Sequence, residues 1–208
     1  MRAVDPPKHG QLEFWESEYK GNAEFSWYCG WDDLEPFWRE LVPDSDARVL
    51  LPGIGNDRAM VDMYDAGWQQ LTAFDYASAG VALAASMFAE RPIDLRVADA
   101  CSLPYADAAY DAALEKGALD AIYLSGGSEA AARTNKLQQA VDELERCIRP
   151  GGIVLSVSAA AAPHVARAFE ASGAWRVLRD GSVHITEDGF ASTNVDATMF
   201  AWARNTDD

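Results

Sequence analysis

Apolar side chains near the amino end of the chain recur at the spacing of amphipathic helices. Leu12, Trp15 and Tyr19 follow one another at intervals of three and four residues, so they share one face of a helix. The same periodicity returns at 34–41, after a pair of aspartates at 32–33 that favours a helix start. The pattern predicts two short helices and, between them, a loop rich in aromatic side chains.

From residue 48 onward, short apolar runs alternate with amphipathic segments. The runs predict strands at 48–51, 70–74, 95–97, 110–114 and 153–157, with two weaker candidates at 175–178 and 197–203. The helical patterns occupy 60–66, 78–90, 137–148 and 165–172. Ser78 is expected to cap the second of these helices. Because strands that alternate with helices form parallel sheets, we predict an α/β fold with a mostly parallel seven-stranded sheet and helices on both faces.

The bulk composition fits a single domain of the cytoplasm. Of the 208 residues, 49% are hydrophobic, which is enough for one sizeable core. The chain has no long apolar run, and its start carries charges and two prolines, so neither a membrane span nor a secretion signal is expected. Cys29, Cys101 and Cys147 lie far apart and predict neither a disulfide framework nor a metal site, which is typical of a reducing compartment.

Charge bears on the class of partner. The formal net charge is −16 and the chain has no lysine or arginine cluster, so we do not expect a nucleic-acid binder. Such an acidic surface is either simply solvated or attracts a basic partner protein. The three histidines, His9, His164 and His184, show no spacing typical of a metal site or a catalytic triad. We expect His9 to lie in a flexible tail, and no metal centre is predicted.

A glycine turn follows the first predicted strand. It reads Gly53-Ile54-Gly55 and opens onto a helix, so its backbone can approach a ligand closely. Asp75 ends the second strand, 20 residues beyond Gly55, where a carboxylate accepts hydrogen bonds from two ribose hydroxyls. A tight turn without a ligand and an aspartate that caps a helix are the alternatives.

Polar residues also follow the third and fourth predicted strands. Asp99 stands where a carboxylate can meet the exocyclic amine of adenine, or can simply form a turn. Glu115, Lys116 and Asp120 lie at the carboxyl end of the fourth strand, which is where ligands bind in open α/β sheets. We expect this segment to face a reaction centre, and an ordinary solvated loop is the alternative.

Five of these segments resemble the successive motifs of class I methyltransferases, which use S-adenosylmethionine. They are PGIGND (52–57), FDY (74–76), VADA (97–100), LEKGALDA (114–121) and RPGG (149–152). With the upstream aromatic segments FWESEY (14–19) and WYCG (27–30), they are similar to the branch that modifies lysines of translation elongation factor 1-alpha. The resemblance covers about residues 13–160 and implies a Rossmann-like class I methyltransferase fold.

The resemblance also implies roles for individual residues toward S-adenosylmethionine. Trp15, Tyr19 and Trp27 would cover the cofactor as part of an N-terminal lid, residues 1–45, on a methyltransferase domain spanning 46–208. The other contacts would come from Gly53 at the amino-acid end, Gly55 in the same turn, Asp75 and Tyr76 at the ribose and adenine, Asp99 and Ala100 at the adenine, and Lys116 near the methionine part.

The expected reaction is direct displacement of the sulfonium methyl group by an acceptor, with S-adenosylhomocysteine as the product. A protein lysine is the favoured acceptor, and a basic protein such as a translation factor would suit the acidic chain. The lysine must lose its proton, since its free pKa is about 10.4. Glu115 or Asp120 would orient the amine or help the proton leave, unless the acceptor binds near His184. A small-molecule methyltransferase and a non-catalytic S-adenosylmethionine-binding protein are the alternatives.

Overall fold

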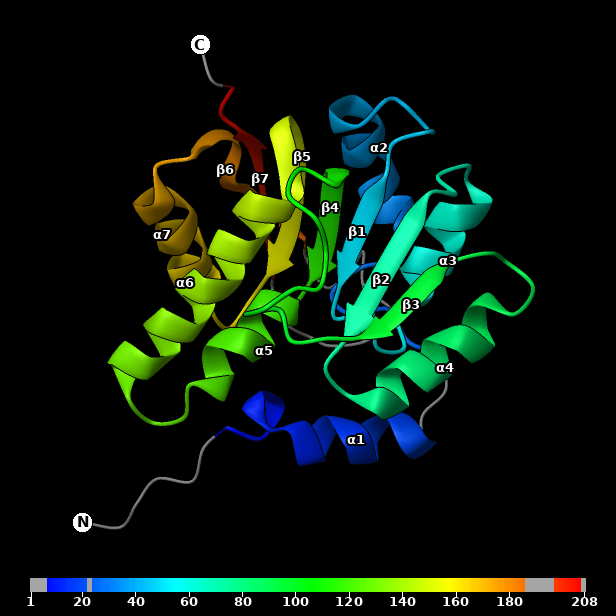
Figure 1. Ribbon diagram of the computed structural model, residues 1–208, viewed down its shortest axis with the longest axis horizontal. Helices are drawn as coiled ribbons and strands as arrows, with labels where there is room; N and C mark the ends of the chain where they lie inside the picture. The colour runs from blue at the N-terminus through cyan, green and yellow to red at the C-terminus, as the bar shows by residue number, and fades with distance from the viewer. Residues whose placement is uncertain (1–6, 22–23, 186–196, 207–208) are drawn as a thin grey trace.

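A seven-stranded sheet forms the centre of the computed structural model, which describes residues 7–21, 24–185 and 197–206 (Figure 1). The strands are β1 (Val49–Pro52), β2 (Leu71–Asp75), β3 (Asp94–Val97), β4 (Tyr110–Lys116), β5 (Ile148–Ser158), β6 (Trp175–Ile185) and β7 (Ala197–Arg204). Their order across the sheet is β3-β2-β1-β4-β5-β7-β6. The first five strands are parallel, and β7 is antiparallel to both of its neighbours. The predicted α/β fold with a mostly parallel sheet is confirmed.

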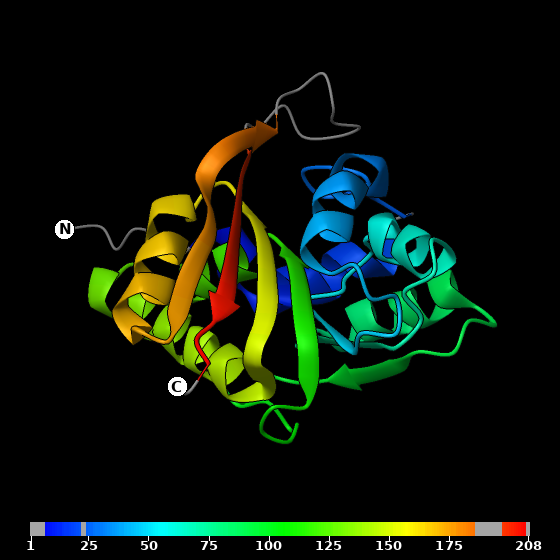
Figure 2. The same ribbon diagram turned by 90° about the horizontal axis from the view of Figure 1, so that it is seen from above.

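Helices cover both faces of the sheet. They are η1 (Lys8–Gly10), α1 (Leu12–Gly21), α2 (Trp31–Leu41), α3 (Arg58–Asp65), α4 (Ser78–Phe88), α5 (Ala118–Ser125), α6 (Ala130–Cys147) and α7 (Ala162–Ser172). Helices α2, α3 and α4 pack on one face and α5, α6 and α7 on the other (Figure 2). Helix α5 is absent from the sequence-based prediction, because its eight residues lie between Gly117 and Gly126. Within the described part of the chain, none of the helices combines the length and apolar character needed to cross a membrane.

The central strand β1 shows how the sheet is buried from both sides. Val49 and Leu51 point into the core formed with α2, α3 and α4, whereas Leu50 points into the core formed with α5, α6 and α7. All four residues of the strand are buried. A continuous apolar run is typical of parallel strands covered on both faces, and it explains why the sequence signal was strongest for the central strands.

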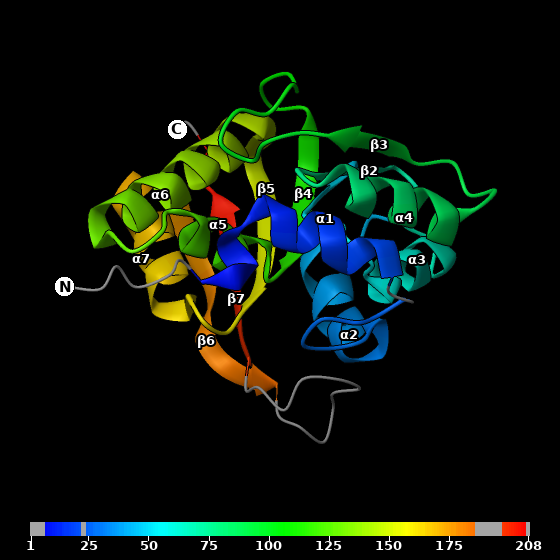
Figure 3. The same cartoon turned by 90° about the horizontal axis from the view of Figure 1, so that it is seen from below.

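Helix α1 crosses the carboxyl ends of the parallel strands (Figure 1, Figure 3). The Glu16 carboxylate of α1 accepts hydrogen bonds from the amide (2.6 Å) and hydroxyl (2.9 Å) of Ser78 and from the amide of Ala79 (3.3 Å). These bonds hold the pKa of Glu16 below its ordinary value and satisfy amides at the positive end of α4. The expected capping by Ser78 is wrong, because Ala77 is the N-cap and the capping oxygens come from α1.

Element boundaries differ from the prediction at the start of α2 and the end of β4, among others. Helix α2 begins at Trp31, ahead of the predicted start, and the Asp33 carboxylate accepts a hydrogen bond from the Gly30 amide (3.0 Å). Strand β4 runs to Lys116 rather than ending at 114, because Glu115 and Lys116 pair with β5. The longer strand decides which way these two charged side chains point.

The stacking of Phe169 on Trp202 gives a test of the core between α7 and β7. The two rings lie 3.7 Å apart between centroids, and Phe169 is fully buried. We expect Phe169→Ala to lower the free energy of unfolding by about 3–5 kcal/mol, measured by urea denaturation, because it leaves a cavity. Val177→Ala is the control, since Val177 is 47% exposed, and it should change stability by less than about 0.5 kcal/mol. Equal losses in the two variants would contradict this packing.

Candidate functional site

A cavity of about 620 Å³ lies at the carboxyl ends of β1, β2 and β4, beneath η1 and α1. The order of the strands reverses between β1 and β4, which is where open α/β sheets bind ligands, and the volume is in the range of small-molecule sites. The predicted site residues that line it are Trp15, Tyr19, Trp27, Gly53, Asp75, Tyr76, Asp99, Ala100, Lys116 and Asp120. Two others, Gly55 and Glu115, are not part of the lining.

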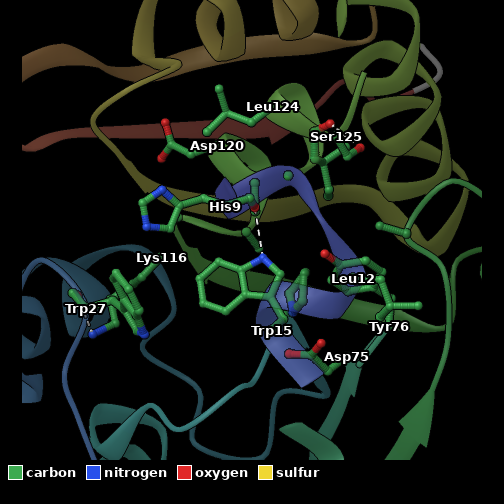
Figure 4. A pocket seen from close by; sticks show the side chains of 18 of the residues that line it. His9, Leu12, Trp15, Trp27, Asp75, Tyr76, Lys116, Asp120, Leu124 and Ser125 are labelled. Atoms are coloured by element: carbon green, nitrogen blue, oxygen red, sulfur yellow. Dashed lines mark hydrogen bonds between the residues drawn. The ribbon is translucent and has the colours of Figure 1, made fainter. Parts of the chain in front are cut away.

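Asp75 stands at the end of β2 with its carboxylate bordering the cavity (Figure 4). One oxygen accepts the Gly55 amide (3.0 Å) and the other accepts the Ala77 amide (2.9 Å). Burial raises the pKa of this carboxyl to about 6 against the lowering effect of those amides. Since each carboxylate oxygen can accept two hydrogen bonds, Asp75 keeps acceptor capacity for a ligand.

Gly55 does not line the cavity, but it supports two residues that do, Tyr19 and Asp75. A methyl group on Gly55 would lie 2.6 Å from the hydroxyl oxygen of Tyr19, and its φ of +46° is in the left-handed region. A glycine is therefore required here for two reasons, the close approach of Tyr19 and the turn itself. The sequence predicts that Gly55 contacts the cofactor directly, but Gly55 does not line the cavity. Its amide instead donates a hydrogen bond to the Asp75 carboxylate.

Aromatic side chains from the N-terminal segments roof the cavity. Trp15 and Tyr19 stack with ring centroids 5.4 Å apart, and Trp27 meets Trp15 edge-on at 5.7 Å. The Trp15 indole nitrogen donates to the carbonyl of His9 (2.8 Å), which joins η1 to α1 (Figure 4). The three aromatic residues singled out in the sequence thus come together over the ends of the strands.

Lys116 fastens the loop before α2 to the sheet. Its ammonium lies 3.0 Å from the Asp57 carboxylate and donates to the carbonyls of Trp27 (3.0 Å) and Cys29 (2.5 Å). The exposed fractions of the two charged side chains are 0% and 5%. Burial raises the pKa of Asp57, and the ammonium opposes that rise. Asp57 also caps α3 through the Ala59 amide, so one ion pair connects β4, α3 and the aromatic roof.

Asp120, in the first turn of α5, is a buried carboxylate that collects hydrogen bonds from two other segments. It accepts the hydroxyls of Ser158 (3.0 Å) and Tyr28 (3.3 Å). It also accepts the amides of Ala159 (3.2 Å) and Ala161. Burial raises the pKa of Asp120, and these four donors oppose the rise. The carboxylate is therefore fixed in position at the cavity wall.

Glu115 does not occupy the position expected of a residue that meets an acceptor. It is completely buried in β4, where its carboxylate accepts the hydroxyl of Ser156 and the amide of Leu119 (3.1 Å). Burial raises its pKa to about 8. Because side chains alternate along a strand, the extension of β4 turns Glu115 away from the cavity and leaves Lys116 bordering it. Glu115 joins β5 to the start of α5.

The residues that the resemblance assigns to the adenine also line the cavity. Asp99 borders the cavity with Tyr76 and Ala100, and its carboxylate also accepts the Cys101 amide (2.9 Å). The aspartate therefore forms the turn considered as an alternative from sequence, while remaining part of the lining. Cys101 lines the cavity too, although the sequence pattern gave no reason to select it.

The histidines illustrate what the sequence pattern missed. His9 was expected in a flexible tail, but it lies in η1 and lines the cavity. Its position depends on long-range packing of η1 against α5, for which spacing along the chain carries no signal. His164 lies outside the lining and bonds to the Tyr123 hydroxyl (3.0 Å). The late segment beyond His184 falls in 186–196, outside the described residues.

The Lys116–Asp57 pair predicts a specific stability pattern. Lys116→Met leaves Asp57 buried without its counter-charge, so the free energy of unfolding should fall by about 3–5 kcal/mol in urea denaturation. Adding Asp57→Asn removes the orphaned charge while retaining a capping oxygen for α3, and should restore part of the loss. If the loss in free energy of unfolding of the double variant equals the sum of the losses in the two single variants, Lys116 and Asp57 are not energetically coupled.

Comparison with known sequences places the chain among methyltransferases. A sequence model described as a methyltransferase domain matches residues 50–156. EEF1A lysine methyltransferase 4 of Bos taurus is 29% identical over 166 residues, which cover 74% of this chain and 62% of the relative. The same enzyme of Mus musculus is 27% identical over 175 residues, covering 77% of this chain and 68% of the relative. The eEF1A lysine and N-terminal methyltransferase of Xenopus laevis is 31% identical over 154 residues, but this chain spans only 22% of its length.

Solved structures with similar folds have diverse functions. The (4+2)-cyclase SpnF superposes with a TM-score of 0.70 at 15% identity, covering 99% of this chain and all of its own. The N-methyltransferase NodS of Bradyrhizobium japonicum WM9 gives 0.63 at 16% identity, covering 84% of this chain and 96% of its own. Identities this low establish the fold alone. Since the domain model spans more than half of the 208 residues, the chain belongs to the methyltransferase domain family and has the Rossmann-like fold of class I S-adenosylmethionine-dependent methyltransferases.

Proposed function

We propose that this chain uses S-adenosylmethionine to methylate a lysine amine of a basic cytoplasmic protein. The observation that carries the proposal is the Asp75 carboxylate, which ends β2 and retains acceptor capacity toward a cavity roofed by aromatic side chains. The curated relatives are named for lysine methylation of eEF1A, and their similarity reaches beyond the residues matched by the domain model. The net charge of −16 would favour encounter with a basic protein.

The lining suits the parts of the cofactor in turn. Asp75 would accept the ribose hydroxyls, and Asp99 with Ala100 would border the adenine. Gly53, with a φ of +64°, lets the turn after β1 pass close to the amino-acid end. Trp15 would close the site from above and exclude water. When bound, S-adenosylmethionine supplies a methyl group already activated on a sulfonium, so correct placement of the acceptor can provide much of the rate acceleration.

The acceptor end would be formed by Asp120 and Tyr28. The Asp120 carboxylate attracts an ammonium group, and its four donors hold it in one orientation. Tyr28 presents its ring at the cavity and its hydroxyl to Asp120. Loss of solvation in this partly apolar surrounding lowers the pKa of the amine and favours the neutral nucleophile, whereas the Asp120 carboxylate raises that pKa.

The proposed activity is tested by incubating the full chain with S-adenosylmethionine carrying a tritiated methyl group, purified eEF1A and, in a parallel reaction, the small-molecule fraction of a cell lysate. We expect tritium in eEF1A, and methyllysine among its amino acids after hydrolysis. Tritium found only in a small molecule would show that the acceptor is a small molecule and not a protein lysine. No transfer to either, with cofactor binding intact, would contradict catalysis of methyl transfer.

The ribose role of Asp75 predicts a pH-dependent affinity. Asp75→Asn should weaken binding of S-adenosylhomocysteine at pH 7.5 by about 1.5–3 kcal/mol, measured by calorimetry, because hydrogen bonds to a charged acceptor are lost. The pKa of Asp75 is raised to about 6, so the carboxylate is ionised above that pH and protonated below it. Wild-type affinity should therefore fall from pH 7 to pH 5, while that of the variant stays nearly level.

Asp94→Asn is the matched control for this experiment. Asp94 is a carboxylate of the neighbouring strand β3 that pairs with Arg96 on the surface, 2.9 Å away, outside the cavity lining. Its substitution should leave affinity at every pH unchanged. The ribose role is excluded when Asp75→Asn binds as tightly as the Asp94→Asn variant at pH 7.5.

A further inference from the structure

His9 reaches the cavity because η1 seats against the end of α5. A methyl group on Gly10 would lie 2.4 Å from the carbonyl carbon of Leu124, so the backbones of the two elements are in direct contact. Asp120 lies one turn before Leu124 on the same helix. Figure 4 shows the His9 imidazole and the Asp120 carboxylate on the same side of the cavity, both directed into it. His9 therefore lies beside the wall where the acceptor amine is placed.

Three other charged side chains that line the cavity already have partners. The Lys116 ammonium is held by a carboxylate and two carbonyls. The Asp120 carboxylate accepts four hydrogen bonds, and Asp75 accepts two amides at the cofactor end. By contrast, no hydrogen bond joins either ring nitrogen of His9 to another residue in the described part of the chain. The imidazole is held instead by its contacts with Phe14 and Trp15, so a ring nitrogen is available.

We propose that His9 is a catalytic residue that accepts the proton of the acceptor ammonium. The inference rests on the proposed function. One N–H bond of the lysine ammonium breaks and its proton passes to an imidazole nitrogen, which leaves a neutral amine. The amine lone pair then forms the N–C bond as the C–S bond of S-adenosylmethionine breaks. The products are a methylammonium group, S-adenosylhomocysteine and an imidazolium that releases its proton to water.

The surroundings of the ring favour the neutral form of the imidazole. Burial lowers the pKa of His9, the neighbouring Lys8 lowers it further, and Glu18 on α1 opposes both. The charged groups that share the cavity with it are Asp120 on α5, Lys116 on β4, Asp75 on β2, Asp99 after β3 and Lys136 on α6. A neutral ring can accept a proton, and a group in this role is typically worth about 100- to 10,000-fold in rate.

The decisive variant is His9→Phe, which keeps an aromatic ring against Phe14 and Trp15 but removes both nitrogens. The bond from Trp15 to the backbone carbonyl of residue 9 does not depend on the side chain. With tritiated cofactor and purified eEF1A, kcat should fall about 100-fold, while the affinity for S-adenosylhomocysteine stays within about 3-fold. His164→Phe is the control and should retain wild-type kcat, since His164 lies outside the cavity lining.

Two further readouts separate proton transfer from a packing role. His9→Ala should regain at least 10-fold of its lost rate when free imidazole is added, and the wild-type rise of kcat/KM with pH near the His9 pKa should be missing from His9→Phe. A His9→Phe enzyme with normal kcat, or an alanine variant that imidazole does not restore, overturns the proposal. If wild type yields no methyllysine, the proposed function has failed instead.

One measurement is independent of turnover. The ring-nitrogen resonances of His9 are followed by nuclear magnetic resonance in the full chain saturated with S-adenosylhomocysteine, while Nα-acetyl-lysine methylamide is added at pH 8. We expect the His9 signals to shift and those of His164 to stay in place. Unchanged His9 signals at saturating amine overturn the proposal.

Discussion

The buried ion pair of Lys116 and Asp57 is the interaction on which the architecture of the site depends. A charge removed from water is costly unless a counter-charge and further hydrogen bonds replace the solvent. Lys116 finds its counter-charge in the cap of α3 and its remaining partners in the carbonyls of Trp27 and Cys29. Those carbonyls are consequently fixed, and the chain before α2 is brought back over the sheet from a position far away in the sequence.

The roof of the cavity follows from that constraint. Once the Trp27 segment is fastened, its indole meets Trp15, which in turn stacks on Tyr19. Tyr19 can approach because glycines stand below it at 55 and 80. Glu16 then secures the other side of α1 by capping α4. The roof is thus joined to the core through the starts of two helices, α3 and α4, which follow the carboxyl ends of β1 and β2.

Sequence reasoning recovered what depends on local spacing. The apolar runs marked each strand, and the positions of Gly53, Asp75 and Asp99 after their strands placed them at one edge of the sheet. It failed where the outcome depends on long-range pairing. The pairing of β4 with β5 extended the strand and turned Glu115 into the interior, while the seating of η1 on α5 brought His9 to the cavity. No periodicity within either segment contains that information.

The fold by itself leaves the chemistry open, since the structural neighbours include a cyclase as well as methyltransferases. In this chain Trp15, Tyr19 and Trp27 form an aromatic roof over the cavity, and we propose that this roof completes the cofactor site. It is tested most directly by calorimetric titration of S-adenosylhomocysteine into the full chain and into a chain lacking residues 1–21, with a melting curve for each. We expect one site in the full chain and a loss of affinity of at least about 100-fold in the shortened chain, equivalent to roughly 2.7 kcal/mol, with the core still folding cooperatively. Equal affinity in two folded chains would contradict it.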